Sequence, residues 1–154
     1  MITTHRTDYY KASPQAMKAM IDLETVTRRL SIPHDLQELI KLRVSQINGC
    51  AFCLDVHAPK ARKAGVSQQK LDVLAAWRES TAFSARERAA LGWADSLTRI
   101  ETSGAADADF APLAEQFSEQ EQVDLTLVIT TMNAWNRFAV GFRVVHPARP
   151  EGAD

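Results

Sequence analysis

Apolar residues recur at helical spacing along the whole chain, whereas the alternating pattern of a half-buried β-strand is sparse. Residues that favour the ends of helices separate the apolar segments, and the clearest are the Ile32-Pro33 break and the Asn48-Gly49 pair. The pattern predicts an all-α fold with about six helices. They cover the residues from Pro14 to the break before Pro33, and then 35–48, 50–64, 67–77, 84–97 and 118–143.

Two Ser-x-x-Glu sequences, at residues 84–87 and 118–121, mark helix starts, because each serine and glutamate can bond a free backbone N–H there. The second opens the longest predicted helix, which is apolar on more than one face and is therefore expected to be central or at an interface. Residues 104–112 predict a looser connection. The tail lacks core-forming residues, so we expect one helical domain at 1–146 and a disordered tail at 147–154.

The composition fits one globular domain, since 45% of the 154 residues are apolar and 24% are charged. A net charge of −1 without any basic cluster gives no electrostatic basis for binding nucleic acid or an anionic membrane, and we expect neither as a partner. The first ten residues lack the apolar core of a secretory signal, and no stretch approaches the roughly 18 apolar residues of a membrane span. We therefore expect a cytoplasmic protein.

Both cysteines lie in one short motif that ends in a histidine, Cys50-x-x-Cys53-x-x-x-His57. On a helix these three side chains share one face within roughly 60°. Free N–H groups and the helix dipole at a helix start stabilise a thiolate. A hydroperoxide oxidises such a thiolate to a sulfenic acid, and a second thiol then condenses with the sulfenic acid to form a disulfide. Cys53 is the better candidate for the attacking thiol because His57 lies one turn beyond it. Cys50 is then the resolving thiol.

The same motif has other interpretations. The cysteines are compatible with buried structural roles, and together with His57 they are candidate metal ligands, although a structural zinc site usually has four protein ligands. The remaining histidines, His5, His34 and His146, lie elsewhere in the sequence. We expect no bound metal and no cofactor. A thioredoxin-like site is excluded because no predicted strand precedes Cys50.

With Glu38 included, the spacing Glu38-x11-Cys50-x2-Cys53-x3-His57 resembles the signature of the alkyl hydroperoxidase D-like branch of the carboxymuconolactone decarboxylase-like family. The resemblance extends to residues 63–65, 84–91 and 133–137. It implies that Cys53 reacts with a hydroperoxide and that Cys50 resolves the product. It also implies that Glu38 and His57 form a proton relay to the thiol.

The resemblance further implies a compact single-domain helical subunit that forms a homotrimer or homohexamer, with a dithiol or a lipoyl-type protein as electron donor. The decarboxylase branch proper lacks the cysteine pair, which argues against lactone decarboxylation. We therefore predict a thiol-dependent hydroperoxide reductase of antioxidant defence. The alternative is a non-enzymatic redox-sensing or scaffold subunit with a reversible disulfide.

Three positions leave structural alternatives open. Asp35-Leu36-Gln37-Glu38 has capping-box spacing, so the Glu38 carboxylate is also a candidate to bond the Asp35 N–H at the helix start. Pro59 predicts a bend two residues after His57, because proline removes a backbone donor and disfavours helix at the preceding residue. The polar residues of segment 133–137 are expected to form hydrogen bonds to the backbone or to a neighbouring subunit, and not to act in catalysis.

Overall fold

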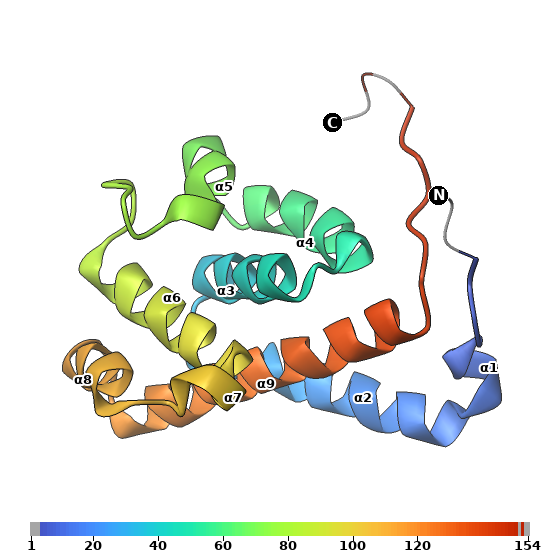
Figure 1. Cartoon of the computed structure of the whole chain (residues 1–154), viewed down its shortest axis with the longest axis horizontal. Helices are drawn as coiled ribbons and strands as arrows, with labels where there is room; N and C mark the ends of the chain where they lie inside the picture. Colours follow the sequence, from blue (N-terminus) through green and yellow to red (C-terminus); the bar gives the residue numbers. More distant parts are fainter. Residues whose placement is uncertain (1–3, 151, 153–154) are drawn as a thin grey trace.

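The computed structural model describes residues 4–150 and residue 152, and its regular secondary structure over that range is entirely helical (Figure 1). The α-helices, in chain order, are α1 (Tyr9–Ala12), α2 (Pro14–Thr27), α3 (His34–Asn48), α4 (Ala51–Lys63), α5 (Gln68–Val73), α6 (Ala85–Thr98), α7 (Ile100–Ser103), α8 (Asp107–Gln116) and α9 (Glu119–Gly141). A 3₁₀ turn at Leu74–Ala76 follows α5. The all-α class is confirmed, with nine α-helices in the described range against about six predicted.

The predicted helix ends agree with the observed ones where a specific capping residue marks them. α6 and α9 begin with the predicted capping boxes. In each box the serine side chain, Ser84 or Ser118, accepts a hydrogen bond from the backbone N–H of the third helical residue. The glutamate at that third position accepts one from the backbone N–H of the serine. α3 ends before Gly49, whose φ of 65° lies in the left-handed region that glycine adopts without steric cost.

The prediction was wrong for residues 104–112, where α8 covers most of the expected loose connection. Two aspartates lie in its first turn, where they complement the helix dipole, and Leu113 is fully buried. That burial offsets the backbone hydrogen bond that Pro112 removes. The four-residue helices α1 and α7 were not predicted, and the expected helix at 67–77 divides into α5 and the 3₁₀ turn.

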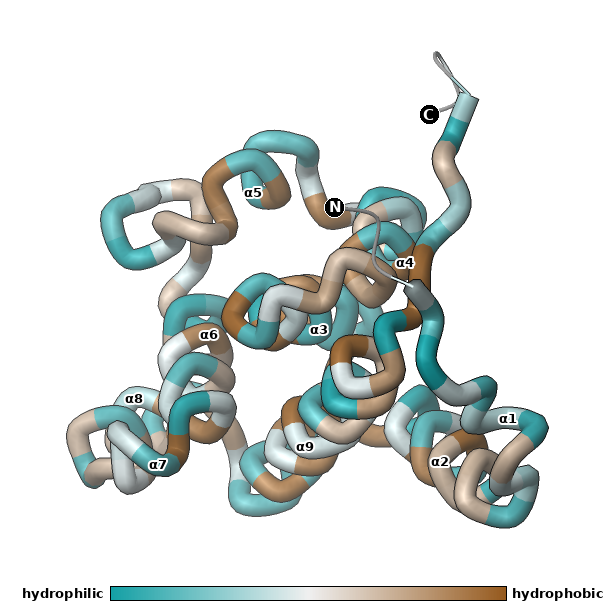
Figure 2. Tube along the Cα trace, turned by 45° about the vertical axis from the view of Figure 1, so that its right-hand side comes forward, coloured by the Kyte–Doolittle hydropathy of each residue, from teal (hydrophilic) through white to brown (hydrophobic). Residues whose placement is uncertain are grey.

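The central helix α3 packs against α4, α6 and α9, while α2 lies along α9 (Figure 1). The α3 side chains Leu39, Ile40 and Val44 are at most 1% exposed. The longest helix, α9, contacts α2, α3, α4, α6 and α8, which confirms its predicted central position. Each helix labelled in Figure 2 carries polar as well as apolar residues, and within the described range none is long and apolar enough to cross a membrane.

The buried carboxylate of Asp95 in α6 binds arginine side chains from two other segments of the chain. Arg43 of α3 donates two hydrogen bonds to it, of 2.6 and 3.0 Å, and Arg78 donates one of 2.5 Å. Burial acts to raise the pKa of the Asp95 carboxyl, but the hydrogen bonds and charges of the two arginines outweigh it, and the pKa lies below its ordinary value. Asp95 is therefore ionised wherever the protein is folded near neutral pH.

Asp95→Asn is expected to lower the free energy of unfolding by about 3–5 kcal/mol, because it leaves the mostly buried Arg43 guanidinium without its counter-charge. The measurement is urea unfolding at pH 7. Since the folded-state pKa is depressed, the contribution is complete above the unfolded value and is lost as pH falls through the folded value. Asp22→Asn, which breaks an exposed pair with Lys18, is the control and costs under about 0.5 kcal/mol. Equal losses of unfolding free energy in the two variants would contradict the role of Asp95 as the counter-charge of Arg43.

The end of the chain runs past α4 (Figure 1). Arg149 forms an ion pair of 2.7 Å with Asp55 of α4. Residues 144–150 form no helix, and residues 151, 153 and 154 of the predicted disordered tail lie outside the described residues. The disorder of the tail and the domain boundary at residue 146 stay predictions.

Candidate redox-active site

A tight connection between α3 and α4 places both cysteines. After Gly49, Cys50 is extended and caps the N-terminus of α4, and its Sγ accepts a hydrogen bond of 3.2 Å from the backbone N–H of Cys53. Cys50 therefore lies one position before the helix and not in its first turn as expected. An extended capping residue directs its side chain at the free N–H groups of the first turn, which explains the difference.

Cys50 and Cys53 form a disulfide, with Cα atoms 5.3 Å apart. Both residues are largely buried, at 1% and 4% exposure, but their surroundings differ. Cys53 lines a surface pocket, and Cys50 is not among the residues that line it. A small molecule that enters this pocket therefore meets the sulfur of Cys53 first.

His57 links the cysteine helix to Glu38 of α3. Its Nδ1 lies 2.7 Å from Oε2 of Glu38. Burial acts to raise the pKa of the Glu38 carboxyl, but the hydrogen bond and charge of His57, with the charges of Lys41 and Lys60, outweigh it and hold the pKa below its ordinary value. An ionised carboxylate only accepts hydrogen bonds, so Nδ1 carries a proton whether or not the ring is charged, and Nε2 is available as a base when the ring is neutral.

A buried lysine extends this pair toward α2. The Lys41 side chain is 3% exposed, and its Nζ lies 2.8 Å from Oε1 of Glu24 and 3.6 Å from Oε1 of Glu38. Glu24 also pairs with Arg28 at 3.5 Å. The two glutamates surround the buried ammonium group, which satisfies the charge that Lys41 brings into the interior.

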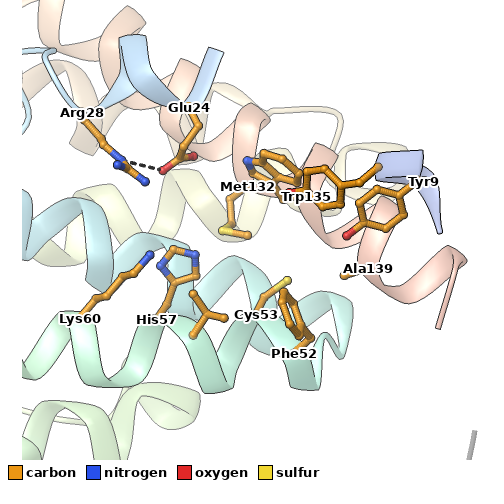
Figure 3. A pocket seen from close by; sticks show the side chains of 12 residues that line it. Tyr9, Glu24, Arg28, Phe52, Cys53, His57, Lys60, Met132, Trp135 and Ala139 are labelled. Carbon is orange, nitrogen blue, oxygen red and sulfur yellow. Dashed lines mark ion pairs between the residues drawn. The ribbon is translucent and has the colours of Figure 1, made fainter. Parts of the chain in front are cut away.

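The pocket in front of Cys53 has a volume of about 230 Å³. In Figure 3, Cys53 and His57 point into it from α4, while Met132 and Trp135 of α9 form the opposite wall and Tyr9 of α1 closes one end. This pocket far exceeds the roughly 10–15 Å³ of such space that one water molecule needs. It therefore has room for an organic group as well as for hydrogen peroxide.

Comparison with known proteins agrees with this architecture. The model of the carboxymuconolactone decarboxylase family matches residues 14–96. The uncharacterised protein YdfG of Bacillus subtilis is 41% identical over 137 residues, which are 89% of this chain and 93% of YdfG. The chain belongs to the carboxymuconolactone decarboxylase family.

Structural neighbours place the chain within that family. A crystal structure from Agrobacterium tumefaciens, of a protein of unknown function assigned to antioxidant defence as an AhpD, has a TM-score of 0.92, 45% identity and coverage of 95% of this chain and 100% of the other. The debrominase Bmp8 has a TM-score of 0.81 at 22% identity, covering 90% of this chain and 74% of Bmp8, and shares the fold alone. The chain lies in the AhpD-like branch of the carboxymuconolactone decarboxylase family.

The four residues expected to form the site in an AhpD-like member of the family lie in one region. Cys50 and Cys53 are bridged, and His57 contacts Glu38 across the α3–α4 interface. Pro59 lies inside α4, which continues to Lys63, so the expected bend does not separate His57 from Glu38. Their catalytic roles stay predictions. Within the described range no group of three or more histidine, cysteine or acidic side chains is arranged to hold a metal ion.

The polar segment at 133–137 divides into two parts. Asn133 and Asn136 accept hydrogen bonds from Asn48 of α3, and Asn136 donates one to Ser45, so these amides have structural partners, but the partners are side chains of the same subunit. Asn133 alone of the two also donates to the backbone, at the carbonyl of Ile129, as expected. Trp135 lines the pocket instead. Its role was missed because sequence spacing relates residues on one helix and does not show which side chains of α4 and α9 face each other.

Proposed function

We propose that this protein is a thiol-dependent hydroperoxide reductase in which Cys53 attacks the peroxide and Cys50 resolves the product. The observation that carries the proposal is the Cys50–Cys53 disulfide with Cys53 alone facing the pocket. The His57–Glu38 pair one turn away supplies a base. Similarity to a protein assigned to antioxidant defence as an AhpD supports the same reaction class.

The proposed reaction has three balanced steps. In the first, the Cys53 thiolate attacks one oxygen of ROOH, the O–O bond breaks, and the products are Cys53 sulfenic acid and, after proton uptake, the alcohol ROH. In the second, the Cys50 thiol attacks the sulfenic sulfur and water leaves, which gives the disulfide. In the third, an external dithiol reduces the disulfide by two thiol exchanges and is itself oxidised to a disulfide.

His57 and Glu38 would act on protons in the first step. The Nε2 of His57 takes the Cys53 proton and later returns a proton to the departing alkoxide. Glu38 holds the ring by the Nδ1–H and stabilises the imidazolium that forms, as an ionised carboxylate next to a protonated ring does. The N–H of Cys53 directed at the Cys50 sulfur stabilises a thiolate there during resolution and reduction.

The proposal includes the partners that the family resemblance implies. The electron donor is a small dithiol or a lipoyl-type protein, and the subunit assembles as a homotrimer or homohexamer in the cytoplasm. Exposed apolar side chains such as Val123 of α9 and Ile100 of α7, at 69% and 56% exposure, provide surface for such contacts.

The deciding experiment is peroxide consumption by the purified protein with several candidate dithiols. A reductase consumes many equivalents of cumene hydroperoxide per subunit while dithiol is present. A redox sensor or scaffold subunit, the alternative function, stops after one equivalent. Consumption that stops at one equivalent with every dithiol would overturn the proposal.

Treatment of the fully reduced protein with one equivalent of hydroperoxide is expected to restore the Cys50–Cys53 bridge within the subunit, since the two sulfurs are adjacent and the sequence has no third cysteine. Peptide mapping by mass spectrometry before and after treatment checks this. Mainly intersubunit bridges, or two thiols that remain free, would count against the assignment.

A further inference from the structure

The pocket has two chemically different ends, with Cys53 between them (Figure 3). On one side of the sulfur the walls are apolar, formed by Phe52, Tyr9 and Ala139. On the other side, beyond His57, lie the charged side chains of Lys60, Arg28 and Glu24. A ligand that fills the pocket while presenting a reactive group to Cys53 therefore has unlike arms on either side of that group.

The charged end has an excess of positive charge. Within the part of the chain that the structure describes, no acidic side chain forms an ion pair with Lys60. Arg28 shares the single charge of Glu24 with the buried Lys41, which lies closer to it. Lys60, Arg28 and Lys63 also line the adjoining surface opening, where Glu38 is the one acidic side chain among the residues that line it, so positive charges outnumber negative ones there as well. An anionic group of a ligand would balance this charge.

The spacing along α4 sets the separation of the two ligand groups. Cys53 and Lys60 are seven residues apart, which is about 10.5 Å along the helix axis. The flexible lysine stem reduces or extends that distance by a few ångströms. This separation is too long for a peroxide with an adjacent carboxylate and suits one with an intervening hydrocarbon segment.

We propose that the site takes an organic hydroperoxide whose –OOH group lies between an apolar arm and a carboxylate-bearing arm, as in a hydroperoxide of an unsaturated fatty acid. This inference rests on the proposed function. The apolar arm contacts Phe52 and the wall of α9, the –OOH group meets Cys53, and the carboxylate pairs with Lys60 and Arg28. The chain ends extend beyond the pocket, since Lys60 and Tyr10 at its rim are exposed.

The carboxylate of the substrate takes no part in the reaction. The Cys53 thiolate gives two electrons to the peroxide, the O–O bond breaks, one oxygen stays on sulfur as sulfenic acid, and the other leaves as the alkoxide. The alkoxide takes one proton and becomes a hydroxy fatty acid with its carboxylate unchanged. The external dithiol of the proposed cycle supplies the two electrons that regenerate the thiols.

The test compares linoleic acid hydroperoxide with its methyl ester, both below their critical micelle concentrations, and includes cumene hydroperoxide as a substrate without any carboxylate. The free acid is expected to have a kcat/KM about five- to tenfold above that of the ester, the size of two solvent-exposed ion pairs. The preference should shrink as ionic strength rises, because salt screens exposed charges.

Lys60→Gln is expected to reduce the acid-to-ester ratio toward one. The ratio is used because any effect of Lys60 on the Glu38 carboxyl acts on both substrates alike and cancels. Arg62→Gln is the matched control, since it removes one exposed positive charge from the same helix on the opposite side from Cys53. Equal kcat/KM for acid and ester, or a ratio that Lys60→Gln leaves intact, would overturn the inference while the peroxidase function stands.

A second readout does not depend on turnover. Linoleic acid should protect Cys53 of the reduced protein from alkylation by neutral iodoacetamide at lower concentration than methyl linoleate does, and Lys60→Gln should reduce the difference. If no hydroperoxide is consumed, the proposed function fails, and this assay alone decides whether the pocket prefers an anion. Equal protection by acid and ester overturns that preference.

Discussion

Cys53→Ser is expected to abolish reaction with hydroperoxide, whereas Cys50→Ser should react once and then stop. The difference follows from position, because Cys53 lines the pocket beside His57 and Cys50 lies behind it with its sulfur on the helix N-terminus. Without Cys50 no second thiol condenses with the sulfenic acid, so the oxidised state persists on Cys53. A hydroxyl in place of the Cys53 thiol is too weak a nucleophile at neutral pH to replace it.

Two measurements separate these outcomes. Stopped-flow peroxide consumption gives the number of equivalents used per subunit, and intact mass after trapping with a sulfenic acid reagent shows which residue holds the oxygen. The doubly substituted protein, with serine at both positions, gives the background. If Cys53→Ser keeps the first turnover and Cys50→Ser loses it, the two roles are reversed.

Local chemistry made much of the fold predictable. The Ser-x-x-Glu boxes and Gly49 determine where three helices begin or end, and each of these signals depends only on residues within one turn. α8 was missed because it lacks a side-chain cap and carries Pro112, and its stability depends on burying Leu113 against α6 and α9. Such packing is a tertiary effect that helical propensity does not contain.

The site shows the same division between local and long-range information. Cys50, Cys53 and His57 are close in sequence, so their helical spacing alone placed them together. The proposed role of Glu38 came from the family resemblance, since the capping-box spacing offered an equally good local explanation. The Lys41–Glu24 ion pair joins residues 17 positions apart on different helices, and no local pattern indicates it.

The geometry of α3 excludes one of the two interpretations of Glu38. Pro33 is the residue that caps α3, and the Asp35 carboxylate bonds the N–H of Leu36 at 2.8 Å. The Glu38 carboxylate points instead at His57 and Lys41. The capping-box interpretation is therefore wrong, and two roles remain for Glu38, as a base partner of His57 or as a counter-charge for the buried Lys41.

Glu38→Gln is expected to slow the reaction of reduced Cys53 with hydroperoxide by roughly 10²–10⁴-fold, the range typical of general acid–base catalysis. Glutamine keeps the shape and an acceptor oxygen but has no negative charge to stabilise the His57 imidazolium. Glu24→Gln is the matched control, because it removes the closer counter-charge of Lys41 without touching His57. It should change the rate only a few-fold while lowering the melting temperature.

The pH dependence tests the same assignment through a different property. The pKa of the Glu38 carboxyl lies below its ordinary value in the folded protein, so its contribution to stability is complete above the ordinary pKa of the unfolded state and is lost as pH falls through the folded value. Melts of Glu38→Gln should therefore show a shallower loss of stability on acidification than the parent. A Glu38→Gln protein with this altered acid profile but an unchanged thiol reaction rate would show that Glu38 serves Lys41 alone, leaving His57 to activate Cys53 without a carboxylate partner.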